Sequence, residues 1–155
     1  MMKEEYRIEK AVELFKEGFN CSQAVVAAFA DLYGFSETQA FKMAASFGGG
    51  IGRMRMTCGA ACGMFMLAGL ETGSVDGKDR AGKSNNYAVV QALAERFKAE
   101  NGSIVCAELL GLDRKEPVTN VAEARTEQYY AKRPCAMMVQ TAASIFAEYL
   151  ESLGK

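Results

Sequence analysis

Residues 20–33, NCSQAVVAAFADLY, have the composition of a helix that is apolar nearly all the way round. Asn20 is a favourable N-cap residue for such a helix. A helix at a protein surface keeps a polar face toward water, whereas one that is apolar on every side belongs in the interior. The segment therefore predicts a buried helix over residues 21–33.

The segments on both sides also have helical spacing. Apolar residues at positions 8, 11, 12 and 15 predict an amphipathic helix over 3–16 that ends at Gly18. Further helices are predicted over 36–46, 58–70, 87–100, 123–132 and 134–153, with a short helical turn at 103–111 and a polar connection at 73–86. Because no segment alternates with period two, the sequence predicts an all-α fold. We expect residues 1–155 to form a single compact domain of about seven helices without a sheet.

The charge balance gives no reason to expect a nucleic-acid or membrane partner. Eighteen basic and nineteen acidic residues leave a formal net charge of −1. The first ten residues contain no apolar run, and no apolar stretch reaches the ~18 residues that span a bilayer. We therefore expect a cytoplasmic protein.

The chain contains five cysteines and no histidine. The lack of histidine excludes Ser/His/Asp and Cys/His catalysis and any zinc site with imidazole ligands. In a reducing compartment, an odd number of cysteines is more typical of redox or metal chemistry than of a disulfide framework. Chemistry in this protein is therefore expected to use cysteine, a carboxylate, Lys or Arg, or a cofactor.

Four of the cysteines lie in the first turns of predicted helices: Cys21, Cys58, Cys106 and Cys135. Unpaired N–H groups and the positive end of the helix dipole stabilise a thiolate at such a place. The pKa of a cysteine there can fall from ~8.5 toward ~7, which makes it a better nucleophile and a better metal ligand. The fifth cysteine, Cys62, lies one turn after Cys58 on the same helix face.

A glycine-rich segment precedes Cys58, in the sequence FGGGIGRMRMTCGAACG at residues 47–63. Gly48, Gly49 and Gly50 permit close approach of the backbone. Arg53 and Arg55 place two positive charges where they can acidify a thiol or bind an anionic substrate. Residues 77–84 match the P-loop pattern, but no strand precedes them, so the match is taken as accidental.

The order of these motifs resembles the C_GCAxxG_C_C family, whose members are expected to be redox-active. The resemblance extends from about Phe19 to Ala142 and rests on Cys21, FGGGIGR at 47–53, CGAACG at 58–63, GSIVCAELLG at 102–111 and Cys135. It implies a small helical protein with Cys21, Cys58, Cys106 and Cys135 as the redox-active cysteines. Two features depart from the family pattern. Arg55-Met56 stands where a small residue and a carboxylate are expected, and Cys62 is an additional thiol that can serve as a resolving cysteine.

Three functional hypotheses follow. The first is a thiol–disulfide oxidoreductase-like protein with Cys58 as attacking thiolate and an unknown redox partner or small-molecule substrate. Its disulfide pairing stays open, and Cys21–Cys58 with Cys106–Cys135 is one arrangement. The second is a zinc or iron–sulfur protein in which the same four cysteines are the ligands. The third is a helical binding or assembly module whose cysteines are simply buried and unreactive, and whose apolar helices at 21–33 and 58–70 can pack against a second copy to form a homo-oligomer.

Overall fold

The computed structural model describes residues 4–113 and 117–155, and within these ranges the fold is all-α. Thr57 and Val105 form an isolated antiparallel bridge, which is the only β-type pairing in the described residues. In keeping with the prediction of about seven helices, the described residues form eight α-helices: α1 (Glu5–Lys16), α2 (Cys21–Phe29), α3 (Glu37–Ala44), α4 (Gly59–Thr72), α5 (Arg80–Asn101), α6 (Cys106–Leu110), α7 (Glu127–Lys132) and α8 (Cys135–Ser152).

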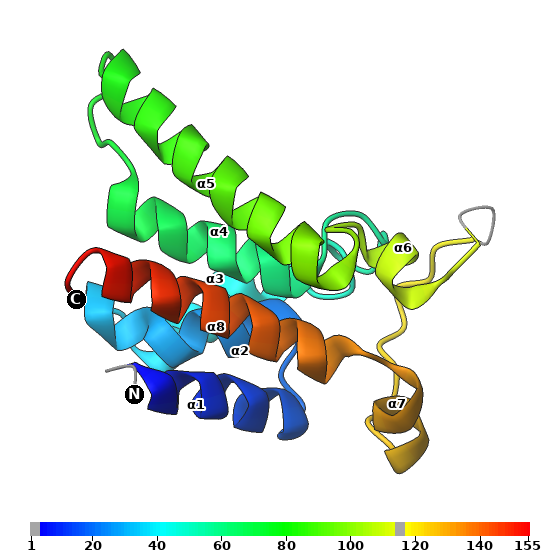
Figure 1. The fold of residues 1–155 in the computed structure, drawn as a ribbon. Helices are drawn as coiled ribbons and strands as arrows, with labels where there is room; N and C mark the ends of the chain where they lie inside the picture. The colour runs from blue at the N-terminus through cyan, green and yellow to red at the C-terminus, as the bar shows by residue number, and fades with distance from the viewer. Residues whose placement is uncertain (1–3, 114–116) are drawn as a thin grey trace.

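The predicted buried helix is the centre of the bundle (Figure 1). Helix α2 packs against α1, α3, α4 and α8, and eight of its nine residues are buried. It begins with a capping box in which the Asn20 side chain accepts a hydrogen bond from the backbone N–H of Gln23. A 3-10 turn at Ala30–Tyr33 completes the predicted segment.

Glycine allows α2 and α4 to approach closely. A Cβ atom at Gly63 would lie 3.0 Å from the Cβ of Val25 and 3.1 Å from the carbonyl oxygen of Ser22. Helices α2 and α4 are the two apolar helices that the third hypothesis packs against a second copy. Within the chain they bury side chains against each other and against α8.

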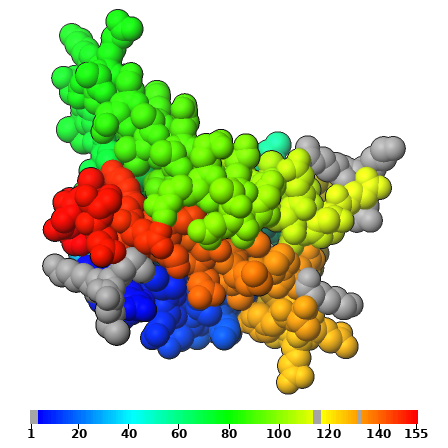
Figure 2. Space-filling model, in the orientation of Figure 1, coloured from blue at the N-terminus to red at the C-terminus, as the bar shows by residue number. Residues whose placement is uncertain are grey.

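The predicted polar connection over residues 73–86 is wrong at its C-terminal end. Asp79 caps α5 by accepting a hydrogen bond from Gly82 N–H, so the helix begins at Arg80. The P-loop-like segment at 77–84 therefore lies partly within a helix. The N-terminal part of α5 leaves the bundle (Figures 1 and 2), and only Leu93 and Phe97 of this helix are buried. Sequence periodicity missed this part of α5 because it buries no apolar face.

The helix predicted over 123–132 begins later, at Glu127, with Thr126 as its N-cap. Residues 117–126 have no regular secondary structure and pass along the end of the bundle where α2, α4 and α8 begin (Figure 1). Within the described ranges, no helix combines the length and hydrophobicity needed to cross a membrane.

Candidate functional site

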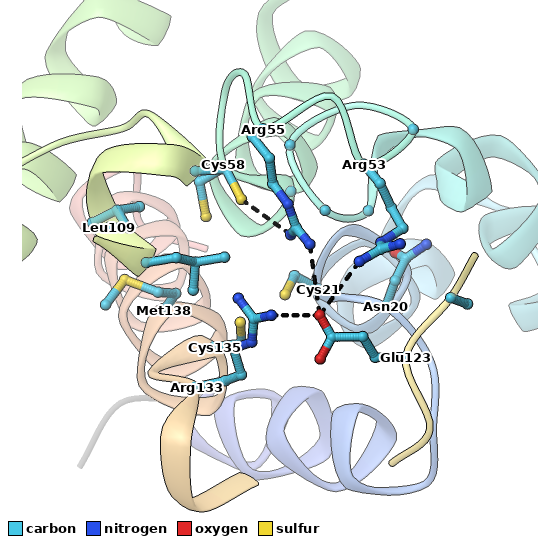
Figure 3. A pocket seen from close by; sticks show the side chains of 18 of the residues that line it. Asn20, Cys21, Arg53, Arg55, Cys58, Leu109, Glu123, Arg133, Cys135 and Met138 are labelled. Carbon is cyan, nitrogen blue, oxygen red and sulfur yellow. Dashed lines mark hydrogen bonds and ion pairs between the residues drawn. The ribbon is translucent and has the colours of Figure 1, made fainter. Parts of the chain in front are cut away.

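A pocket of about 460 Å³ lies at this end of the bundle and is lined by four of the five cysteines (Figure 3). Cys21, Cys106 and Cys135 are the first residues of α2, α6 and α8, and Cys58 is the N-cap of α4. We refer to these four residues as the thiol cluster. The N-cap residues of α4, α6 and α8 are Cys58, Val105 and Pro134, respectively.

Backbone pairing brings Cys58 and Cys106 together although they are 48 positions apart in the sequence. Cys58 N–H donates to the Ile104 carbonyl oxygen at 2.6 Å, and Cys106 N–H donates to the Met56 carbonyl oxygen. Ala107 N–H adds a bond to the Arg55 carbonyl oxygen at 3.2 Å. The isolated bridge thus joins the start of α4 to the start of α6.

The glycine-rich segment forms a tight left-handed turn beside the thiol cluster. Residues 49–53 all have positive φ, between 56° and 73°, and Arg55 has φ 61°. Such a conformation costs roughly 1–2 kcal/mol per non-glycine residue. Backbone bonds offset part of that cost, including one of 3.1 Å from Arg53 N–H to the Gly48 carbonyl oxygen.

Gly50 has a second reason to be glycine, because it lies against Cys106. A Cβ at Gly50 would meet the Cβ of Cys106 at 2.5 Å. Gly48 is similarly close to the Asn20 side chain. The predicted glycines therefore line the pocket as backbone packed against the starts of α2 and α6.

Cys135 is the most acidic thiol of the cluster. Hydrogen bonding from the Cys21 thiol lowers the pKa of Cys135 to about 7, with further stabilisation of the thiolate by the charge of Arg133 and by the Tyr129 hydroxyl, against an opposing effect of burial. The same interaction, together with burial, raises the pKa of Cys21 well above its ordinary value. Cys21 and Cys135 thus form a pair that shares one negative charge near neutral pH.

The other cysteines keep their protons at neutral pH. Burial raises the pKa of Cys58 to about 12, and the nearby backbone N–H groups of Ala61 and Ala60 oppose this effect only in part. Burial also raises the pKa of Cys106, and a hydrogen bond from Arg55 acts in the opposite direction. The N-cap position of Cys58 does not acidify it as expected, because desolvation of the thiolate outweighs the helix dipole.

Cys62 lies apart from the thiol cluster. It is not among the residues that line the pocket, and its thiol donates to the Thr57 carbonyl oxygen at 3.7 Å. Burial raises the pKa of Cys62 to about 11. The helix spacing places Cys62 correctly one turn after Cys58, but it does not direct the side chain toward the pocket.

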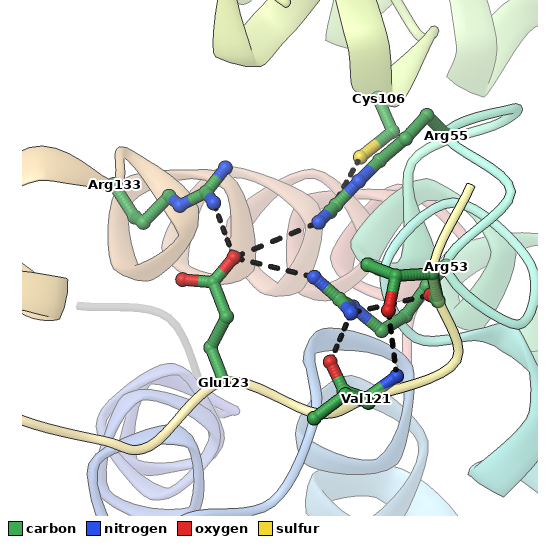
Figure 4. Close-up of polar contacts among 7 residues, drawn as sticks. Arg53, Arg55, Cys106, Val121, Glu123 and Arg133 are labelled. Atoms are coloured by element: carbon green, nitrogen blue, oxygen red, sulfur yellow. Dashed lines mark hydrogen bonds and ion pairs between the residues drawn. The ribbon is translucent and has the colours of Figure 1, made fainter. Parts of the chain in front are cut away.

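Three arginines converge on one carboxylate next to the thiols (Figure 4). Glu123 Oε1 accepts contacts from Arg53 Nη2 at 3.3 Å, from Arg55 Nη2 at 3.7 Å and from Arg133 Nη2. Arg53, Arg55 and Arg133, hereafter the arginine triad, come from the left-handed turn and from the residue two positions before α8. Arg55 also donates to Cys106 Sγ at 3.7 Å, which joins the triad to the thiol cluster.

The pocket brings together four of the five predicted cysteines, the three predicted glycines and both predicted arginines. It also contains Glu123, Arg133 and Tyr129, which the sequence alone did not single out. Glu123 was expected at the start of the helix predicted over 123–132, whereas it lies beside the pocket in a segment without regular secondary structure. Arg133 carries one usable signal, because it is two residues before Cys135. Tyr129 faces the same thiol from α7, and no spacing rule connects it to the other site residues.

A preformed metal site is not found among the described residues, since no three Cys, Asp or Glu side chains are grouped so that they could hold an ion. All five cysteines are free thiols. The metal hypothesis for Cys21, Cys58, Cys106 and Cys135 therefore has no support from a ligand geometry in this structure.

The comparisons with known proteins agree with the arrangement of the cysteines. Residues 19–149 match the family model described as "Putative redox-active protein (C_GCAxxG_C_C)". The chain belongs to this family. No curated protein and no solved structure matches the chain.

Proposed function

We propose that the protein carries out thiol–disulfide exchange with Cys135 as the attacking thiolate and Cys21 as the resolving thiol. The observation that carries the proposal is that Cys21 and Cys135 begin α2 and α8 in the same pocket and interact directly with each other. Hydrogen bonding from Cys21, with Arg133 and Tyr129 beside it, lowers the pKa of Cys135 to about 7. An attacking thiol is most effective when its pKa is near the ambient pH. The sequence favoured Cys58 as the attacking thiolate. Because burial raises the pKa of Cys58 to about 12, Cys135 is the better candidate for this role.

The reaction needs only a disulfide substrate and a dithiol to regenerate the protein. Cys135 Sγ attacks one sulfur of the substrate disulfide, a mixed disulfide forms, and the other substrate sulfur leaves as a thiolate that takes up a proton. Cys21 then loses its proton and attacks Cys135 Sγ. The second substrate thiol is released, and the protein holds a Cys21–Cys135 disulfide. Two electrons pass from the cysteine pair to the substrate, and an external dithiol returns them.

Mass spectrometry of the reduced protein after reaction with hydroxyethyl disulfide tests this scheme. The expected product has lost two hydrogens and yields a linked peptide containing Cys21 and Cys135. Cys21→Ser should instead accumulate a mixed disulfide on Cys135, because the resolving thiol is missing. Cys135→Ser should react at least about tenfold more slowly at pH 7, since the remaining thiols are protonated.

Cys62→Ser is the matched control, because it removes a buried thiol outside the pocket and should cycle normally. If Cys58→Ser abolishes the reaction while Cys135→Ser retains it, the attacking role belongs to Cys58 and our assignment fails. If four thiols are masked until a stoichiometric metal is removed, a metal centre replaces thiol–disulfide exchange. Thiols that stay inert in metal-free folded protein would also overturn the proposal.

A further inference from the structure

The pocket carries much more positive charge than the rest of the protein. Among the described residues that line it are four arginines and one glutamate, with no lysine or aspartate. The arginines and the glutamate give the pocket a formal excess of three positive charges, or two when the negative charge shared by Cys21 and Cys135 is included, whereas the whole chain has a net charge of −1. A concave site lined by one sign of charge concentrates ligands of the opposite sign.

One of the four arginines has a structural role. Arg125 donates to the carbonyl oxygens of Phe15 and Phe19 at 2.8 and 2.9 Å, and its guanidinium lies 4.3 Å from the centre of the Phe15 ring. These bonds tie residues 117–126 to the end of α1. Arg125 is thus satisfied by groups of the protein itself. Within the arginine triad, Arg53 also donates to the carbonyl oxygens of Thr119, at 3.2 Å, and of Val121. These carbonyls satisfy hydrogen bonds but carry no formal charge, so they do not neutralise the triad.

The arginine triad is only partly neutralised. All three guanidinium groups meet Glu123 at the same oxygen, Oε1, so one negative charge faces three positive ones (Figures 3 and 4). The side chains of Arg53, Arg55 and Arg133 are only 18–21% exposed. Charges with so little access to water repel each other more strongly than charges in solution. Such a cluster has capacity for a further anion.

The Glu123 carboxylate is placed so that such an anion can displace it from the arginines. Its side chain is 37% exposed, about twice as much as any arginine of the triad. Glu123 lies in residues 117–126, which have no regular secondary structure, so its carboxylate can move away from the three arginines without breaking a helix. Guanidinium groups bind carboxylates with charge-assisted hydrogen bonds, and Glu123 demonstrates that a carboxylate fits among these three.

We infer that the arginine triad is a binding subsite for a carboxylate of a small anionic disulfide or thiol, which takes the place of Glu123 next to the thiol cluster. Arg55 places the subsite beside the thiols through its bond to Cys106. A pocket of about 460 Å³ has the size of a small-molecule site. The inference rests on the proposed thiol–disulfide exchange, and it assigns a substrate class to that reaction.

Three small disulfides of different charge test the substrate class: dithiodiglycolate, with two carboxylates, hydroxyethyl disulfide, which is neutral, and cystamine, with two ammonium groups. The rate at which each disulfide oxidises the reduced protein is divided by the rate at which the same disulfide reacts with mercaptoethanol. This ratio removes differences in intrinsic reactivity between the disulfides. We expect dithiodiglycolate to be preferred over the neutral probe by about tenfold or more at low ionic strength. The preference should shrink as salt approaches ~1 M.

Variants separate the subsite from the general charge of the protein. Arg55→Gln should reduce the preference for dithiodiglycolate at least about threefold. Glu123→Gln should increase it, because the competing carboxylate is gone. Arg96→Gln and Glu148→Gln are the matched controls, since these two residues form an exposed ion pair on α5 and α8 outside the pocket. They remove the same charges and should leave the preference unchanged.

Binding without chemistry is measured separately, by calorimetry of Cys135→Ser with thiodiglycolate, a dicarboxylate thioether that no thiol reduces. Saturable binding that Glu123→Gln strengthens supports the subsite even if no disulfide is reduced, in which case only the proposed function fails. Equal normalised rates for the three probes, with active thiols, overturn the subsite and leave thiol–disulfide exchange standing. Absence of thiodiglycolate binding to both Cys135→Ser and its Glu123→Gln double variant also overturns the subsite.

Discussion

Two clusters of arginine and carboxylate lie near opposite ends of α2. Carboxylates outnumber guanidinium groups in one cluster, and guanidinium groups outnumber carboxylates in the other. Beyond the C-terminal end, Arg7 forms ion pairs with Glu4 and Asp31 and donates to the Ala28 carbonyl oxygen at 2.9 Å. Two carboxylates thus face one guanidinium. At the N-terminal end, the arginine triad faces the single carboxylate of Glu123.

The difference separates a structural cluster from a candidate binding site. Arg7 is buried, with 4% of its surface exposed, and protein groups satisfy it from three directions. Burying a charge is tolerated when it is paired and hydrogen-bonded in this way. The triad is also shielded from water but lacks enough negative charge of its own. An arginine cluster that has too few carboxylates of its own, such as the triad, is the kind that indicates an outside ligand.

The largest effect that would test this comparison is on stability. Arg7→Met should lower the free energy of unfolding by about 3 kcal/mol, because it leaves the mostly buried Glu4 without its partner. Arg133→Met should cost less than about 1 kcal/mol, since Glu123 keeps two other arginines. Urea unfolding of both variants measures the difference. Equal losses would contradict the division into a structural and a binding cluster.

A smaller effect concerns the reactivity of Cys135. The charge of Arg133 contributes to lowering the pKa of Cys135, after hydrogen bonding from Cys21. Arg133→Met should therefore raise that pKa from about 7 and slow alkylation by iodoacetamide at pH 7 about two- to fivefold. Peptide mapping across a pH series gives the midpoint. The Arg7→Met variant serves as the control, and a similar shift in it would show that the effect is not local to the pocket.

The smallest expected effect is the acid sensitivity of the Arg7 cluster. Hydrogen bonding from Arg7 lowers the pKa of Asp31 in the folded protein. The contribution to stability is therefore complete above the unfolded value of ~3.9 and is lost as the pH falls through the lower folded value. Because the Asp31 side chain is 64% exposed, we expect less than about 1 kcal/mol. Urea unfolding between about pH 5 and about pH 3 should show a steeper loss for wild type than for Arg7→Met.

Local sequence signals predicted the parts of the fold that depend on neighbouring residues. Asn20 begins α2 as the predicted N-cap, and Ser36, the first residue of the helix predicted over 36–46, is the N-cap of α3. Gly102 and Gly111 end α5 and α6 in left-handed conformations. The early start of α5 was missed, because its first turns bury almost nothing and helical periodicity reports burial rather than backbone conformation.

The amino-acid sequence by itself determined the all-α fold, the family and the positions of four cysteines at helix starts, since caps and hydrophobic spacing act over a few residues. Only the tertiary structure decided which thiol is acidic. The pKa of Cys135 depends on Cys21, Tyr129 and Arg133, whereas burial keeps Cys58 protonated. The arginine triad with Glu123 is likewise a product of tertiary structure, because Arg53 lies 70 positions from Glu123 and Arg55 is almost as distant, so these charges interact only where the folded chain brings them together.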